Sequence, residues 1–425
     1  MYFDLRVILL GLLLAAGNAP FAQSELADDQ GASAYVASQF GRIDDAINAE
    51  IAAGKIPGAV VLIARNGNIE YHKSFGFADI DSKTPMRDDS IFRIASMTKA
   101  ITTAAVMTLY EKGHFLLNDP VAKYIPEFTD MTVVSAVDDD GSMTSTVSAT
   151  APVRIIDLLT HTSGIGYPFI RGSVRKAYVD AGIIDGLTVR DITLDSQMKL
   201  LAEQPLQFEP GSNMAYGLST DLLGYLVEVV SGRSLEQYFA EEIFAPLKMH
   251  DSHFYLPEDK ADRLVTLYAD VEDGGLIVSR GDESTIILDD PLYPITGARS
   301  YFSGGAGLSS TATDYARFLL MLLNDGELDG VRVLSRSSVQ LMRTARIDTD
   351  DDQVPDISLG FAVVSDPGKN SEQGSVGTYS WGGAFYTSFW VDPSEELVAV
   401  FMSQVRPAKS DISRKFKSLV YQSLE

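Results

Sequence analysis

The chain has 425 residues, of which 45% are hydrophobic and 22% charged, and these fractions are typical of a globular protein rather than a disordered or fibrous one. Its formal net charge of −24 repels phosphate backbones and anionic lipids, which argues against binding to nucleic acid or to a membrane surface. Because the chain has no cysteine, disulfides, thiol nucleophiles, iron–sulfur clusters and thiolate zinc sites are excluded.

The first residues have the pattern of an export signal. An apolar run from Val7 to Ala16 follows one arginine and precedes small residues. The run is shorter than the ~20 apolar residues that span a bilayer, and it is typical of a secretory signal peptide cleaved after Ala22. We therefore expect residues 1–22 to be removed, no membrane anchor to remain, and the protein to be secreted or periplasmic. A buried N-terminal helix is the alternative interpretation.

The two ends of the remaining chain mirror each other. Apolar residues recur every three or four positions between about residues 33 and 55, which predicts an amphipathic helix. Two β-rich runs follow around Asn66-Gly67, a pair that suits a tight hairpin turn. Near the other end, two predicted strands flank a turn at 392–396, and a helix capped by Ser410 follows. We expect one mostly antiparallel sheet built from both ends and flanked by the terminal helices.

The middle of the chain is mostly helical by pattern. Residues 132–152 and 257–300 lack clear periodicity and are predicted to be irregular loops or insertions. Helices are predicted from Ser96 to Gly113, within 153–164, and after caps at Ser219, at Ser234, and at Thr311 or Thr313.

Ser96 and Lys99 stand three residues apart at the start of a buried helix, so their side chains share one face. Free N–H groups and the helix dipole at this end favour an oxyanion and a deprotonated serine. An amine beside the hydroxyl can take its proton, which yields an activated nucleophile. Such a pair also arises often by chance, and a surface lysine beside a cap serine is the alternative.

Two distant motifs add to this pair. Tyr216 stands on a turn just before a predicted helix, where a tyrosinate is less costly. Trp381 precedes two glycines in a predicted strand, and such glycines mark close approach of a ligand or another backbone. The next N–H, at Ala384, could then face a substrate carbonyl. Taken alone, the tyrosine is better explained as filling a loop, and a strand bulge is the alternative interpretation of the two glycines.

The order of Ser-Met-Thr-Lys, Leu-Leu-Thr-His-Thr-Ser-Gly, Pro-Gly-Ser-x-x-x-Tyr and Trp-Gly-Gly-Ala resembles that of the family VIII carboxylesterases, relatives of class C β-lactamases and DD-peptidases. The resemblance covers nearly the whole chain, from about residue 33 to 425. It implies an α/β sandwich like that of β-lactamases and penicillin-binding proteins. We expect a sheet domain from residues 31–97 and 300–425, a mostly helical domain from residues 98–299, and an active site in the cleft between them.

The resemblance also implies roles for individual residues. Ser96 would be the acylated nucleophile, and Lys99 and Tyr216 the acid–base pair, with the base of each step left open. The N–H groups of Ser96 and Ala384 would form the oxyanion hole. Substrate-binding roles fall to Trp381, Gly382, Gly383 and Leu218.

Two departures from the β-lactamase pattern favour esters over lactams. Leu218 replaces the amide of Tyr-x-Asn, and Trp381 replaces the cation of Lys-Thr-Gly. We therefore expect hydrolysis of short-chain acyl esters, with weak hydrolysis of some β-lactams as a side activity. The alternatives are a β-lactamase or D-amino-acid peptidase-type amide hydrolase, an acyltransferase, and a penicillin-sensor-like binding module. The expected partner is a small-molecule ester, with no cofactor and no metal, and no oligomeric state is predicted.

Three further features are interpreted as structural. His161 is expected to be a turn residue rather than part of a Ser–His–acid triad. His250 and His253 have a possible ligand spacing with Asp251, but the stretch resembles a turn of the family. The acidic loop 348–356 could bind calcium, yet it lacks the glycine and terminal glutamate of an EF-hand loop.

Overall fold

The computed structural model describes residues 29–271, 275–279, 293–349, 355–368 and 373–424. Residues 1–39 and 40–425 form two separate units, and only the second is treated below, apart from residues 29–39, which begin helix α1 (Asp29–Ala52). The predicted signal peptide and the centre of the acidic loop, residues 350–354, lie outside the described residues. Among the described helices, none combines the length and apolar character needed to span a bilayer.

An eight-stranded antiparallel sheet is built from both ends of the chain, as predicted, with the order β12-β13-β14-β15-β16-β1-β2-β3. The first and last thirds meet where β1 pairs with β16 and Val60 lies opposite Met402. The strands are β1 (Gly58–Arg65), β2 (Asn68–Asp79), β3 (Thr84–Pro85), β12 (Asp356–Ile357), β13 (Ala362–Val363), β14 (Tyr379–Gly383), β15 (Thr387–Asp392) and β16 (Leu397–Met402).

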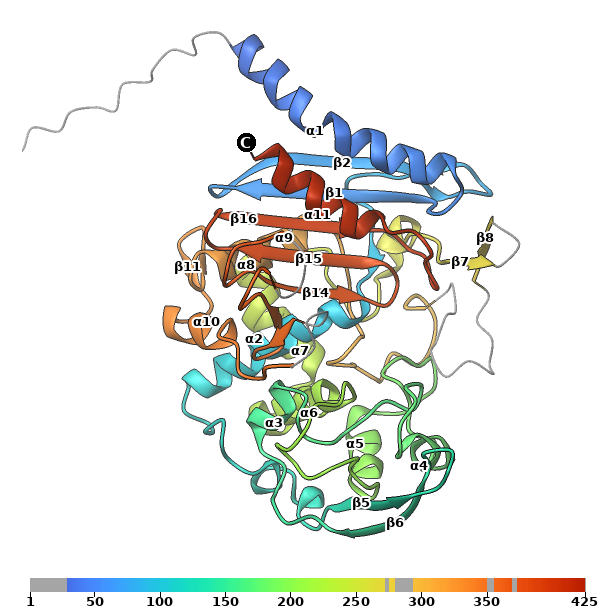
Figure 1. Ribbon diagram of the computed structural model, residues 1–425, viewed down its shortest axis with the longest axis vertical. Helices are drawn as coiled ribbons and strands as arrows, with labels where there is room; N and C mark the ends of the chain where they lie inside the picture. The colour runs from blue at the N-terminus through green and yellow to red at the C-terminus, as the bar shows by residue number, and fades with distance from the viewer. Residues whose placement is uncertain (1–28, 272–274, 280–292, 350–354, 369–372, 425) are drawn as a thin grey trace, which may run out of the picture. The chain divides into compact units, whose positions relative to one another are not determined.

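The predicted hairpin turn between β1 and β2 is confirmed. Asn66 and Gly67 both have positive φ, at 51° and 77°, which is the geometry that Asn-Gly tolerates. All but the last residue of β1 are buried, so side chains alternate between two cores on opposite faces. Val61 packs with the layer formed by α1 and α11 (Ile412–Ser423), whereas Leu62 packs with the larger core beneath. Figure 1 shows α11 and the part of α1 from residue 40 onward on one face of the sheet, where Phe40, Ile43 and Phe416 belong to the same core layer. The predicted fold class, an antiparallel sheet flanked by helices, is confirmed.

Helices from the middle of the chain surround α2, the predicted core helix, which is buried from Thr98 to Leu109 and is followed by Gly113 at positive φ. The division into a sheet domain and a helical domain stays a prediction. The remaining helices are α3 (Ile155–Leu159), α4 (Arg175–Asp180), α5 (Leu194–Ala202), α6 (Ser219–Ser231), α7 (Leu235–Phe239), α8 (Ala245–Leu247), α9 (Ala312–Leu323) and α10 (Arg336–Met342).

Residues 132–152 were expected to be irregular, and this prediction is wrong. They hold the hairpin of β5 (Thr132–Val137) and β6 (Met143–Ser148), which lies far from the large sheet (Figure 1). Val137 and Val147 are each 52% exposed, so the hairpin has no alternation of buried and exposed apolar residues. Within 257–279 the structure likewise has a 3₁₀ segment (Glu258–Arg263) and the pair β7 (Tyr268–Val271) and β8 (Gly275–Val278).

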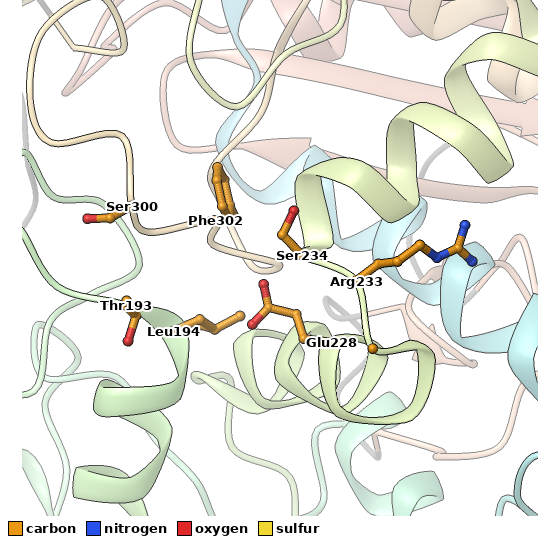
Figure 2. Close-up of a pocket in the computed structure, with 8 residues that line it drawn as sticks. Thr193, Leu194, Glu228, Arg233, Ser234, Ser300 and Phe302 are labelled. Atoms are coloured by element: carbon orange, nitrogen blue, oxygen red, sulfur yellow. The ribbon is translucent and has the colours of Figure 1, made fainter.

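The predicted helix caps are confirmed in part. Ser234 accepts the Gln237 N–H at the start of α7, and Thr311, not Thr313, caps α9. Ser219 is not a cap, because it is the first residue of α6 and its hydroxyl pairs with Ser163 at 2.8 Å. A cavity of about 410 Å³ lies beside the ends of α5, α6 and α7 (Figure 2).

Candidate active site

Ser96 lies on a strained turn that leads into the core helix. It belongs to one 3₁₀ turn, η1 (Ala95–Met97), that runs directly into α2. Ala95 has a φ of 42°, in the left-handed region that costs an L-residue about 1–2 kcal/mol. Two hydrogen bonds from distant residues fix the turn. The Tyr315 hydroxyl donates to the Met97 carbonyl at 2.8 Å, and the Leu308 N–H donates to Thr98 Oγ1 at 3.1 Å. A strained residue that its surroundings fix in this way is typical of a functional turn.

Lys99 is buried and bonded on all sides. Its side-chain amine donates to Ser96 Oγ at 3.2 Å, to the Tyr167 hydroxyl at 3.0 Å and to the Gly305 carbonyl at 2.8 Å. An ammonium has three donors, so each is used. The residue is only 1% exposed, and its amine is therefore held in one position beside the Ser96 hydroxyl.

Tyr216 approaches the same hydroxyl from another part of the chain. Its phenol donates to Ser96 Oγ at 2.7 Å, and the Lys99 amine lies 4.7 Å from the centroid of its ring. The structure thus brings together the three residues predicted as the catalytic set. Both candidate proton acceptors lie within hydrogen-bond reach of one serine oxygen.

The sequence interpretation missed two buried residues behind Lys99. Tyr167 is 3% exposed, and burial holds the pKa of its hydroxyl well above its usual range, so it stays a neutral phenol. Asp221 on α6 accepts from Ser303 at 2.5 Å and from the Gly305 N–H at 3.2 Å. Burial raises the pKa of Asp221, and the charge of Lys99 opposes that rise.

Gly305 shows how closely these groups meet. A Cβ at this position would lie 2.3 Å from Asp221 Oδ2 and 3.3 Å from the Tyr167 hydroxyl. Only a glycine lets the backbone pass between them while its carbonyl accepts from Lys99. Two sequence features could have pointed to these residues: the tyrosine after the Thr-Ser-Gly motif and the paired glycines at 304–305. Neither feature belongs to a periodic pattern or to a motif of known spacing, so neither predicts a position near Lys99.

Gly217 is also explained by close contact. Its φ is not in the left-handed region, yet a Cβ there would lie 2.1 Å from the Ile165 carbonyl oxygen. The glycine therefore lets the Tyr216 turn pack directly on the segment before Tyr167.

The Trp-Gly-Gly strand lies against the Ser96 turn. A Cβ on Gly383 would lie 2.3 Å from the Ile94 carbonyl oxygen, two residues before Ser96. Gly382, by contrast, is exposed, and its Cβ would come no closer than 3.2 Å to the Thr387 carbonyl oxygen. Ala384 follows at the exposed end of this strand. The predicted oxyanion donors, Ser96 and Ala384, thus belong to two segments in direct contact.

His161 connects the motifs through its ring. The imidazole lies edge-on to Tyr216 with the ring centroids 5.0 Å apart, and it stacks on Trp381 at 6.2 Å. Burial, with the charge of Lys99, lowers the pKa of His161 to about 3. The ring is therefore neutral at physiological pH and forms part of an aromatic wall. Its positive φ of 57° agrees with the predicted turn role.

Leu218 does not lie where the sequence placed it. Its side chain is fully buried and belongs to the main core, so it does not reach the surface of the site. The residue precedes α6, and its N–H donates to the Gly166 carbonyl at 3.3 Å. The predicted substrate-binding role is corrected to a packing role beneath the Tyr216 turn.

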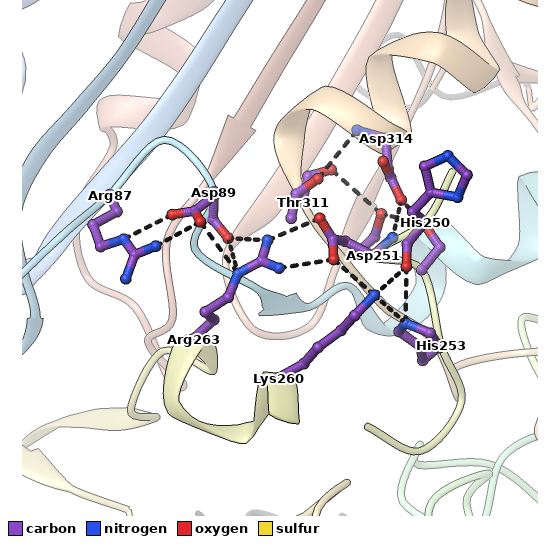
Figure 3. Close-up of polar contacts among 11 residues, drawn as sticks. Arg87, Asp89, His250, Asp251, His253, Lys260, Arg263, Thr311 and Asp314 are labelled. Carbon is purple, nitrogen blue, oxygen red and sulfur yellow. Dashed lines mark hydrogen bonds and ion pairs between the residues drawn. The ribbon is translucent and has the colours of Figure 1, made fainter. Parts of the chain in front are cut away.

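The His250–His253 stretch forms an ion-pair network, drawn in Figure 3. Arg263 bonds both oxygens of Asp251 at 2.8 Å and, with Lys260, lowers the pKa of that carboxyl to about 2. Within the described parts of the chain, no cluster of three His, Cys, Asp or Glu side chains could hold a metal ion. Asp251 is neutralised by these side-chain cations.

Comparison with known proteins shows which family the chain belongs to and which proteins it is similar to. The model of a protein family described as Beta-lactamase matches residues 43–420. Protein Rv1367c of Mycobacterium tuberculosis is 36% identical over 372 residues, which cover 84% of this chain and 87% of that protein. Esterase EstB of Burkholderia gladioli is 32% identical over 382 residues, covering 86% and 91% of the two chains.

A solved structure shares the fold. EstCE1, titled a hydrolase with promiscuous acyltransferase activity, superposes with a TM-score of 0.79 and 28% sequence identity. The match covers 92% of this chain and 100% of EstCE1.

Proposed function

This chain belongs to the β-lactamase family and is a carboxylic ester hydrolase of that fold, and we propose that it cleaves short-chain acyl esters through an acyl-enzyme on Ser96. One observation carries the proposal: Ser96 Oγ lies 3.2 Å from the Lys99 amine and 2.7 Å from the Tyr216 hydroxyl. Once either of these two neighbours has lost its own proton, it can take the proton of the serine and so activate the nucleophile.

The proposed reaction uses these groups in two steps. As Ser96 Oγ bonds to the ester carbonyl carbon, the serine proton passes to the Lys99–Tyr216 pair, and either member can act as base. The N–H groups of Ser96 and Ala384 stabilise the negative carbonyl oxygen. The bond to the alcohol oxygen then breaks as that oxygen takes the proton. Water repeats the sequence on the acyl-enzyme and releases the acid.

Two features favour a neutral ester over a β-lactam. Trp381 presents apolar surface where β-lactamases of this type carry a cation for the lactam carboxylate, and it is half-buried beside Tyr216, with ring centroids 5.8 Å apart. Leu218, in place of an amide, is buried in the core. We expect hydrolysis of a chromogenic cephalosporin to be far slower than that of the best ester.

The test is a chain-length series of p-nitrophenyl esters, hydrolysed by the wild type, by Ser96→Ala and by Ser212→Ala. Ser212 is a matched control, because it is exposed on the turn before Tyr216 and donates only to the Glu209 carbonyl. We expect Ser96→Ala to lose at least about 10⁴-fold in kcat and Ser212→Ala to keep wild-type rates. Mass spectrometry after phosphonate labelling should find the adduct on Ser96. Full activity of Ser96→Ala, or an adduct on another residue, contradicts the proposal.

Acyl transfer is a second candidate, favoured by the likeness to EstCE1. An alcohol that replaces water on the acyl-enzyme would form a new ester with no change in the acylation step. The ratio of transfer to hydrolysis, measured with an added short-chain alcohol, distinguishes the two activities.

We also propose that the protein is exported and cleaved after Ala22. The support is the apolar run at residues 7–16 with small residues behind it. N-terminal sequencing of the protein recovered from its native host tests this, and an intact Met1 would contradict it.

A further inference from the structure

The cavity in Figure 2 is separate from the site around Ser96. It lies between the start of α5, the end of α6, the start of α7 and the segment around Phe302. Glu228 in its wall follows Asp221 by seven residues on the same helix, which is two turns or about 10 Å. At about 410 Å³, the cavity is within the size range of small-molecule sites.

A carboxyl group points into this space. Figure 2 shows the Glu228 side chain directed between Leu194, Ser234 and Phe302. One oxygen accepts the Leu235 N–H at 2.9 Å, and within the described residues the carboxyl bonds to nothing else. Burial raises the pKa of Glu228, the Leu235 N–H opposes that rise, and the charge of Asp195 adds to it.

The arginine in the lining does not supply that cation. Arg233 donates to Glu241 at 2.6 Å and to Glu242 at 2.8 Å, and its guanidinium stacks 4.5 Å from the centroid of the Tyr238 ring. In Figure 2 it points away from the cavity. The charge of Arg233 is therefore balanced by Glu241 and Glu242, outside the cavity.

The other walls are apolar or hydroxyl-bearing. Leu194 and Phe302 offer apolar surface. The hydroxyl oxygens of Thr193 and Ser234 accept the backbone N–H groups of Ser196 and Gln237, both at 3.2 Å, as helix caps. These hydroxyls cannot neutralise a carboxylate, although they can make polar contacts at the rim.

We propose that this cavity is a second ligand site, for a small organic cation whose ammonium group pairs with Glu228 and whose short apolar body packs against Leu194 and Phe302. The proposal does not rest on the proposed esterase reaction, because no lining residue is among the hydrogen-bond partners of Ser96, Lys99 or Tyr216 in the described chain.

Calorimetric titration of the full chain with n-butylammonium tests the proposal, with n-butanol and butyrate as probes of the same length. The buffer should contain about 0.15 M salt, because a chain of net charge −24 attracts any cation non-specifically at low ionic strength. We expect one saturable butylammonium site, and about 10-fold to 100-fold weaker binding by Glu228→Gln, which keeps the acceptor for the Leu235 N–H. Butanol and butyrate should not saturate.

Two further variants test whether butylammonium binds in this cavity rather than at another carboxylate. Glu395→Gln removes a carboxylate that pairs with Arg65 on the large sheet, and it should bind butylammonium as the wild type does. Ser300→Phe fills the cavity without changing its charge and should abolish binding. Equal affinity in Glu228→Gln and the wild type, or no saturable site in the wild type, overturns the proposal.

Discussion

The two walls of the candidate site differ in burial and in bonding. Behind Ser96, Lys99 is 1% and Asp221 0% exposed, and the lysine amine has three hydrogen-bond acceptors. In front, Tyr216 and Trp381 are half-buried and meet mainly through their rings. The difference teaches that the core fixes the position of Lys99, whereas few polar contacts hold the front wall, which under the proposed function would set which ester enters.

After the loss of Ser96 itself, the largest expected effect is at Gly383, where the Trp-Gly-Gly strand contacts the Ser96 turn. Gly383→Ala should lower kcat/KM by about 100- to 1000-fold, because its Cβ would lie 2.3 Å from the Ile94 carbonyl oxygen and displace the predicted oxyanion donors. Gly382→Ala, whose nearest contact is 3.2 Å, should stay within about tenfold of the wild type. Equal losses in the two variants would contradict direct contact between the strand and the turn.

The second prediction concerns the imidazole ring of His161, which contacts Tyr216 and Trp381. Since the pKa of His161 is lowered to about 3, unfolding takes up a proton below the usual pKa of about 6.5. Stability should therefore fall by roughly 1.4 kcal/mol per pH unit from this residue as pH drops from 6.5 toward 3. His161→Asn removes the titration and tolerates the positive φ. Urea unfolding at several pH values should show a shallower decline for this variant, and an identical decline would mean that His161 is charged in the folded protein.

The third prediction tests the rear wall. Tyr167→Phe removes one acceptor from the Lys99 amine and should lower kcat by about 10- to 100-fold, with a changed pH profile and little change in KM. Tyr178→Phe is the control, because this fully buried tyrosine donates to the Pro205 carbonyl, away from Lys99. If both variants lose stability but neither changes kcat, Tyr167 has only a structural role.

The smallest effect on rate is expected at the front. Trp381→Phe should change the preferred acyl-chain length while kcat/KM for the best ester stays within about tenfold. The other tryptophan, Trp390, is buried against Phe416, so Trp390→Phe should lower stability and leave chain-length preference unchanged. An unaltered preference in Trp381→Phe would place the specificity pocket elsewhere.

Much of the fold could be predicted because its signals are local. The Asn66-Gly67 turn, the terminal helices and the buried helix after Ser96 each follow from spacing or turn chemistry. The β5–β6 hairpin could not be, since most of its side chains are exposed and carry no alternating pattern. The assignment of Ser219 as a cap failed because its hydroxyl bonds Ser163 instead.

The sequence by itself determined which residue types are candidates for the proposed chemistry, because a spacing of three predicts that Ser96 and Lys99 share one face of a helix. Only the tertiary structure decided what surrounds them. The Lys99 amine bonds Tyr167, 68 residues away, and Gly305, 206 residues away. The same packing turned Leu218 inward and made Gly217 necessary against Ile165. Such contacts depend on how separate segments pack, and no local period or motif encodes a distance between segments that meet only in the folded core.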